Sequence, residues 1–169
     1  FDNLTGLSSG SSSVWITRTS GGTAKLYNFA MGPDDQSTAQ FYVKDTGLAG
    51  ASAVSDISLA GPKIYFNATV SGQKKLQVYD GVTTTSLLPA NVVSVGPARL
   101  INSTVYFAAT QNNITKLWKS NGTTLSTTVS AVDPRWVEVD PTFGLQSSAV
   151  VGDTLYYSAK TVQGVEPAF

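Results

Sequence analysis

Two stretches of this chain are nearly superimposable: Ile64-Tyr-Phe-Asn-Ala-Thr-Val-Ser-Gly-Gln-Lys-Lys-Leu76 and Val105-Tyr-Phe-Ala-Ala-Thr-Gln-Asn-Asn-Ile-Thr-Lys-Leu117. Less complete copies begin at Val14 and Leu155, so repeats start near residues 14, 64, 105 and 155, at intervals of 50, 41 and 50 residues. A period of this size indicates a supersecondary unit that buries its apolar face only against neighbouring units.

Each repeat has the pattern of short strands separated by turns. Alternating side chains after Val105 and again after Ile114 predict two strands. The Asn121-Gly122 pair, like Asp80-Gly81 one repeat earlier, predicts a two-residue type I′ hairpin, because both central residues of that turn have positive φ. Residues 123–129 and 91–101 supply two further strands, and no segment predicts a helix; the best helical candidate, 50–59, aligns with strands elsewhere.

These patterns predict an all-β fold made of antiparallel four-stranded blades in a β-propeller-like array of about four repeats. Residues 1–169 are expected to form one all-β repeat domain, or an excerpt of a larger propeller. The last repeat is expected to be incomplete, because Phe169 aligns with Lys119, before the closing turn and the final strand.

The amino-acid composition disfavours several kinds of binding partner and active site. The chain has 11 basic and 11 acidic residues, which disfavours a nucleic-acid partner held through phosphates. It contains no cysteine and no histidine, which removes disulfides, zinc–thiolate sites and the commonest general base. The apolar runs are too short to span a membrane. No cofactor and no metal are predicted.

One motif resembles a known family. The segment Lys116-Leu-Trp-Lys-Ser-Asn-Gly-Thr123 is similar to the ELWxxDGT repeats of large bacterial surface and secreted proteins, with Lys for Glu and Asn for Asp. The segment Lys75-Leu-Gln-Val-Tyr-Asp-Gly-Val82 matches more loosely, with Gln in place of Trp. The likeness is clearest over 105–129. It implies a β-propeller-like stack on an extracellular or cell-surface protein, and it brings no catalytic residues with it.

Aromatic side chains recur at two adjacent repeat positions. The first position holds Trp15, Tyr65, Tyr106 and Tyr156, and the second holds Ile16, Phe66, Phe107 and Tyr157. Adjacent strand residues face opposite sides of a sheet, so packing between successive sheets would bury both positions. We expect these aromatics to form the core; the alternative is a stacking platform for sugars.

The candidate ligand-binding residues are Arg135 and Trp136, which lie outside the repeat pattern. Exposed Trp and Arg are common in binding surfaces, although an ordinary strand with a core tryptophan also fits this segment. Calcium ligation by Asp34 and Asp35, or by Asp133 and Asp140, is disfavoured because no dense acidic loop is present.

Glycosylation sites of the Asn-x-Ser/Thr type occur five times, at Asn3, Asn67, Asn102, Asn113 and Asn121. They have meaning only if the source organism N-glycosylates its proteins. Otherwise Asn and Thr are simply the turn and strand residues of this repeat.

The sequence therefore favours a non-enzymatic extracellular or cell-surface module for adhesion, ligand binding or structural spacing. Its expected partners are other repeats or chains, through strand pairing and sheet packing, and a glycan or a surface protein. The alternative is a secreted subunit of an extracellular filament assembled by β-strand exchange. A third class, a glycoside hydrolase or lyase using Asp133, Glu138 and Asp140, is disfavoured because the chain has only two glutamates.

Overall fold

The computed structural model describes residues 3–10, 13–31, 41–60, 63–123, 128–129, 138–142, 144–161 and 164–168. These residues form antiparallel strands joined by turns, which confirms the all-β prediction. The helical candidate at 50–59 is indeed a strand. Among the described residues, no helical segment has the length and hydropathy that a membrane crossing needs.

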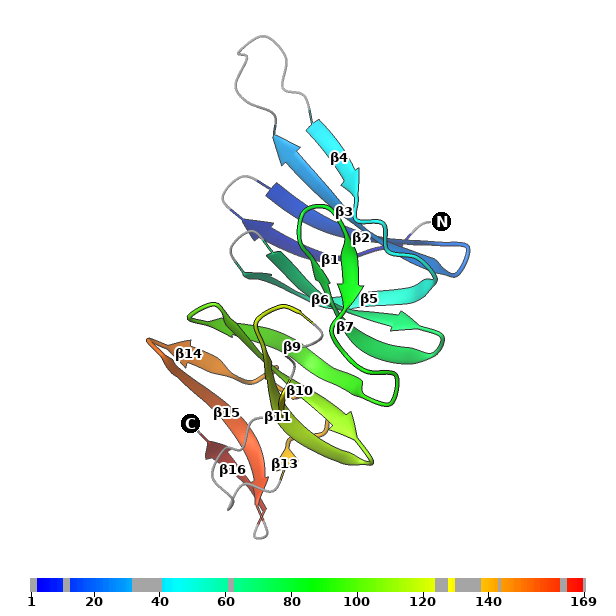
Figure 1. Cartoon of the computed structure of the whole chain (residues 1–169). Coiled ribbons are helices and arrows are strands. Elements are labelled where there is room, and N and C mark those ends of the chain that lie inside the picture. The colour runs from blue at the N-terminus through cyan, green and yellow to red at the C-terminus, as the bar shows by residue number, and fades with distance from the viewer. Residues whose placement is uncertain are drawn as a thin grey trace.

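The strands pair into four sheets along the chain (Figure 1). The first sheet contains β1 (Asn3–Gly10), β2 (Ser13–Ser20), β3 (Thr23–Met31) and β4 (Phe41–Asp45). The second contains β5 (Ala51–Ala60), β6 (Lys63–Val70), β7 (Gln73–Tyr79) and β8 (Thr84–Ser86). The third contains β9 (Val93–Ile101), β10 (Thr104–Gln111), β11 (Ile114–Ser120) and β12 (Thr128–Val129). The fourth contains β13 (Glu138–Val139), β14 (Ala149–Val151), β15 (Thr154–Thr161) and β16 (Gly164–Ala168).

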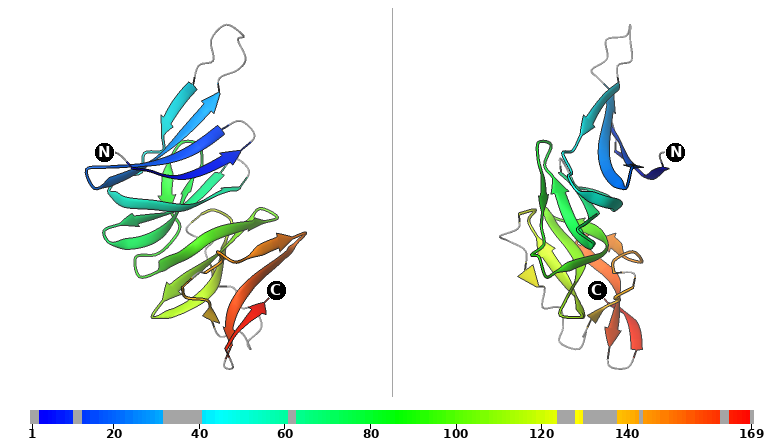
Figure 2. Two further views of the ribbon diagram at one scale, coloured as in Figure 1. Left: turned by 180° about the vertical axis from the view of Figure 1, so that it is seen from behind. Right: turned by 90° about the vertical axis from the view of Figure 1, so that its right-hand side faces the viewer.

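The four sheets follow one another from the blue end of the chain to the red end without closing into a ring (Figures 1 and 2). Their strands are unequal, since β8 has three residues and β12 has two. In the fourth sheet, β13 and β14 both pair with β15, and β16 also pairs with β15. The structure thus shows stacked antiparallel sheets but no closed propeller and no uniform four-stranded blades.

Each interface between successive sheets combines the same two repeat positions. An aromatic at the first repeat position shares a buried cluster with an aromatic at the second position of the next repeat. These pairs are Trp15 with Phe66, Tyr65 with Phe107, and Tyr106 with Tyr157. The alternation follows from strand geometry, because neighbouring residues on one strand point to opposite faces. Most of the predicted aromatic core is therefore confirmed.

Tyr156 is the exception. Its side chain is 45% exposed, whereas Tyr65 at the equivalent position is 3% exposed. Tyr156 lies on the face of the fourth sheet that points away from the third sheet, and no described sheet covers that face. The prediction that all of these aromatics are buried was wrong at this position, since a side chain is buried only where a neighbouring sheet exists.

The type I′ hairpins lie at other turns than the sequence predicted. Only the glycines of Asp80-Gly81 and Asn121-Gly122 have positive φ, so neither pair forms a type I′ turn. Two-residue loops with two positive φ values occur instead at 71–72 and 112–113, within the hairpins β6–β7 and β10–β11. At Asp80 the carboxylate accepts hydrogen bonds from the N–H groups of Val82 and Thr83. An aspartate or asparagine can thus close a turn with its side chain instead of with an αL backbone.

An irregularity recurs in the first strand of every sheet, opposite the second aromatic position of the central strand or the residue that follows it. In β5, Asp56 and Ile57 together lie opposite the single residue Phe66, and in β9 residues 96–98 lie opposite Phe107. β1 has its irregularity between Leu4 and Leu7. In the fourth sheet the same place holds the whole segment 140–148, which separates β13 from β14. Bulges often re-aim side chains or mark functional sites.

Candidate functional site: bulges and repeated hollows

The predicted ligand residues Arg135 and Trp136 lie outside the described residues, as do Asp34, Asp35 and Asp133. The half-buried Asp140 lies where the fourth sheet has its insertion, and its carboxylate accepts a hydrogen bond from the Thr142 N–H at 2.8 Å. In the described ranges, no three acidic side chains gather closely enough to hold a metal ion.

The asparagines of the five glycosylation motifs differ in accessibility. Asn102, Asn113 and Asn121 are exposed on turns, and Asn102 donates a hydrogen bond to Asp153 at 2.8 Å. Asn67 is only 1% exposed, and its Nδ2 is engaged in two hydrogen bonds. A glycosyltransferase has no access to such a nitrogen in the folded chain. The side chain of Asn3 lies outside the described part of the molecule.

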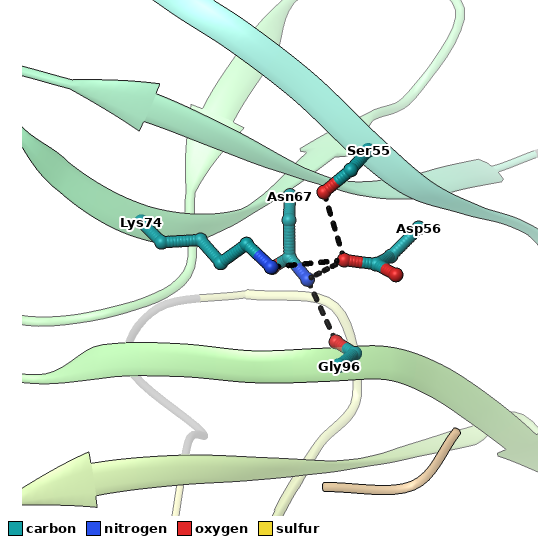
Figure 3. Close-up of polar contacts among 5 residues, drawn as sticks. All are labelled: Ser55, Asp56, Asn67, Lys74 and Gly96. Atoms are coloured by element: carbon teal, nitrogen blue, oxygen red, sulfur yellow. Dashed lines mark hydrogen bonds and ion pairs between the residues drawn. The ribbon is translucent and has the colours of Figure 1, made fainter. Parts of the chain in front are cut away.

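Asn67 belongs to a polar cluster at the β5 bulge (Figure 3). One carboxylate oxygen of Asp56 accepts hydrogen bonds from Ser55 Oγ at 2.8 Å, Asn67 Nδ2 at 3.0 Å and Lys74 Nζ at 3.2 Å. Asn67 Nδ2 also donates to the carbonyl oxygen of Gly96 at 2.7 Å. Because Gly96 lies in the bulge of β9, the cluster connects the bulges of the second and third sheets.

Burial raises the pKa of the Asp56 carboxyl, but hydrogen bonds from Asn67 and Ser55, together with Lys74, outweigh burial and hold that pKa below its ordinary value. Asp56 is therefore a carboxylate near neutral pH. A general acid needs the opposite shift, toward the working pH. The hydrogen bonds of this cluster therefore fit a structural contact that holds two sheets together better than they fit an acid catalyst. Sequence reasoning missed this cluster, because nothing in the repeat pattern distinguishes Asp56 from a turn aspartate.

A buried lysine, Lys75, supports the loop that follows β8. Lys75 Nζ donates hydrogen bonds to the carbonyl oxygens of Pro89 at 2.9 Å, Ala90 at 2.7 Å and Val92 at 2.5 Å. Burial lowers the pKa of the Lys75 ammonium. Three carbonyl acceptors satisfy all three protons of the ammonium group. Lys75 therefore stabilises the backbone conformation of this loop.

Three surface hollows lie at equivalent places in the first three repeats. Their volumes are about 210 Å³, 430 Å³ and 150 Å³. The same repeat position contributes a lysine to each hollow, namely Lys25, Lys75 and Lys116. The position two residues later contributes a ring or an amide, namely Tyr27, Gln77 and Trp118. The position two residues earlier contributes Thr23, Gln73 and Ile114.

The lysines of the three hollows differ in their partners. Lys25 forms an ion pair with Asp45 at 2.7 Å, and the hydrogen bond from this ammonium lowers the pKa of Asp45. Lys75 is occupied by carbonyl groups, as described above, while Lys116 is exposed. Trp118 stacks on Phe107 with ring centroids 6.5 Å apart, and its Nε1 donates to the Ala109 carbonyl at 3.1 Å. The hollows therefore share three repeat positions in their lining, while their size and their polar groups vary from repeat to repeat.

Comparison with known proteins adds no relative to this picture: no family model, no curated protein and no solved structure matches the chain.

Proposed function

We propose that the chain is a non-enzymatic β-repeat module of an extracellular or cell-surface protein, whose sheets are successive blades of a propeller-like array. Its function is adhesion through a polymer with a repeating structure, such as a surface polysaccharide. The observation that carries this proposal is the recurrence of a hollow at the same place in three successive repeats.

A repeated hollow suits a repeated ligand. Sheets that pack face to face lie on the order of 10 Å apart, so equivalent positions recur at about that interval. A polymer with matching spacing engages several hollows at once, and linked weak contacts add up to high avidity without any single strong site. Apolar surface beside amide and ammonium groups, as at Ile114 with Gln111 and Lys116, fits a sugar ring with its apolar face and polar edge.

The test uses one exposed residue from each hollow: Thr23→Ala, Gln73→Ala and Lys116→Ala. Each single variant is expected to weaken binding of the purified chain to an immobilised polysaccharide array by a few-fold, and the triple variant by more than about tenfold. Lys119→Ala is the matched control, because Lys119 is exposed on the same strand as Lys116 but on its opposite face. Unchanged binding by the triple variant, or binding of no polymer by the parent chain, contradicts the proposal.

A second candidate function, filament assembly by strand exchange, has one observation in its favour. In the first three sheets a fourth strand follows the third, but within the described residues nothing pairs with the outer edge of β16. Pro167 lies on that edge strand, and proline on an edge limits further strand pairing. Light scattering separates the candidates, since a stable monomer fits the binding module and polymers that dissolve only in denaturant fit strand exchange.

A further inference from the structure

The second hollow is lined by two buried polar side chains from one strand. Lys75 and Gln77 of β7 border it, and they are 8% and 5% exposed. Because they are two residues apart on a strand, they lie on the same face of the sheet. The hollow is the largest of the three, and its volume of about 430 Å³ lies within the range of roughly 300 to 1,000 Å³ that is typical of small-ligand sites.

The side-chain amide of Gln77 has no hydrogen-bond partner within the described part of the chain. It is not fully enclosed, because the hollow lies beside it. A polar group that is withdrawn from water without a hydrogen bond destabilises the folded chain, and such groups are therefore rarely left unpaired. A ligand in the hollow would supply the missing hydrogen bonds.

The two hydroxyl groups that line this hollow already donate their protons within the chain. Thr84 Oγ1 donates to the carbonyl oxygen of Thr46 at 2.7 Å, and Ser86 Oγ donates to that of Leu88 at 3.4 Å. A hydroxyl has one proton, so what these two offer a ligand is their lone pairs. Acceptors of this kind match the hydroxyl protons of a sugar, and they do not suit an ion that has only acceptor oxygens.

Lys75 gives the second hollow a positive charge. Carbonyl oxygens take its three protons, so the ammonium acts on a ligand through its charge and not through a hydrogen bond. No aspartate or glutamate is among the described residues that line any of the three hollows. Burial lowers the pKa of the Lys75 ammonium, and an anion beside it would favour the charged form.

We propose that the second hollow binds a sugar acid, and that the polymer recognised by this chain is an acidic polysaccharide whose units carry a carboxylate. The carboxylate accepts hydrogen bonds from Gln77 Nε2 beside the charge of Lys75, while hydroxyl groups of the same unit donate to Thr84 Oγ1 and Ser86 Oγ. This inference rests on the proposed function and narrows its ligand from polysaccharides in general to polymers of uronic acids.

The lysines of the other two hollows are expected to contribute unequally to this selection. Lys116 is exposed in the third hollow, so its ammonium is accessible to a carboxylate of the same polymer. Lys25 in the first hollow is already paired with Asp45 at 2.7 Å, which offsets its charge. The second hollow, with its unpaired amide, is therefore expected to contribute most to the preference for an acid.

The first experiment compares matched polymers. Oligomers of polygalacturonate, alginate and hyaluronate are each tested beside the same oligomer with its carboxyl groups reduced to alcohols. By calorimetry, the full chain is expected to bind at least one acidic oligomer about tenfold more tightly than its reduced form. Equal affinities, or tight binding of a neutral polymer instead, overturn the acidic assignment and leave polymer binding intact. Binding of no polymer at all contradicts the proposed function itself.

The second experiment changes the amide. Gln77→Glu replaces the donor by a carboxylate, and the charge of Lys75 beside it should let the variant fold, which a urea midpoint checks. The ratio of the affinities for the acidic and the reduced oligomer is expected to fall about tenfold. Gln77→Leu, which keeps the bulk and removes the donors, should lower that ratio a few-fold.

Gln146→Glu is the matched control, because it makes the same change of charge at an exposed residue that lines none of the three hollows. It should leave the ratio unchanged. A purely structural Gln77 would weaken the binding of both oligomers alike, so an unchanged ratio in both Gln77 variants overturns the proposal.

Competition distinguishes a sugar acid from a simple anion. The monomeric uronic acid is expected to displace the bound oligomer, whereas acetate and sulfate at the same concentration are not, since they bring no hydroxyl protons for Thr84 and Ser86. Displacement by acetate or sulfate as effective as that by the uronic acid overturns the assignment of a sugar acid.

Discussion

At the scale of single residues, the place held by Asn67 shows how one repeat position serves different chemistry. In the second sheet, an amide nitrogen at this position bonds the bulge of the next sheet at 2.7 Å. In the third sheet, the equivalent Ala108 has no polar group, and the facing backbone approaches it closely at Gly144 instead. A hydrogen bond and a close approach are thus alternative ways to seat a bulge against the preceding sheet.

Gly144 is expected to be among the least replaceable residues. A Cβ there would lie 2.2 Å from the carbonyl oxygen of Val95, a backbone atom that cannot move away cheaply. Gly144→Ala should lower the free energy of unfolding by about 2 to 4 kcal/mol, because overpacking adds to the strain of a positive φ. Gly152→Ala is the matched control, since Gly152 has a similar φ of +59° but no atom within 4 Å.

Urea denaturation at constant temperature measures both variants. Gly152→Ala reports the backbone strain alone, about 1 kcal/mol, so the difference between the two variants isolates the close approach. Equal destabilisation would show that the fourth sheet does not pack on Val95 as described.

The Asp56 cluster predicts a pH dependence of stability. Its folded-state pKa lies below the ordinary value, so this carboxylate contributes stability that is present above the unfolded pKa, about 3.9, and lost as pH falls through the folded pKa. Asp56→Asn should therefore destabilise the chain near neutral pH and make less difference below about pH 4.

The measurement is the urea midpoint of the parent chain and of Asp56→Asn between pH 7 and pH 3. The gap between the two proteins should shrink on acidification. A gap that stays constant over this range would mean that the charge of Asp56 contributes nothing to stability. Lys74→Met, which removes only the ion pair at 3.2 Å, should produce a smaller gap.

At the scale of elements, the strands differ in how many of their faces are covered. On β10, Phe107 contacts the second sheet and Ala108 contacts the fourth, so both faces are buried. On β15, Tyr157 is buried against the third sheet while Tyr156 is exposed. Hydrogen-bonded pairing alone does not distinguish these strands, because each pairs with strands on both sides.

In native-state hydrogen exchange, the amides of a central strand with two buried faces should therefore exchange more slowly than those of a strand with one buried face. Amides of β10 are expected to exchange at least about tenfold more slowly than those of β15, because local opening of β15 exposes less buried apolar surface. The readout is peptide-level mass spectrometry of the full chain, with β6 as an internal reference that should match β10. Equal protection of β10 and β15 would indicate that opening is global and insensitive to packing on the end face.

At the scale of the whole molecule, the strands and the stacking order follow from sequence, because the repeat and its alternating aromatics determine which faces meet. Burial of Tyr156 does not follow, since it depends on a neighbouring sheet and not on the residue itself. The turns were misassigned because Asn-Gly favours positive φ but Asn121 closes its turn with its side chain, which accepts the Thr123 N–H at 3.2 Å. The Asp56 cluster and the hollows bring together residues from separate strands, and spacing along the chain does not reveal such contacts.

The bulged first strand also has a consequence for how this architecture changes in length. The excess of the first strand over the central strand grows from one residue in β5 to two in β9 and then to the longer insertion at 140–148, yet the central hairpin keeps its register each time. Residues can therefore be inserted or deleted at the bulge of the first strand without shifting the register of the aromatic positions. That tolerance makes the bulge a natural place for lineage-specific loops, and a practical one for grafting an epitope or a tag into the folded chain.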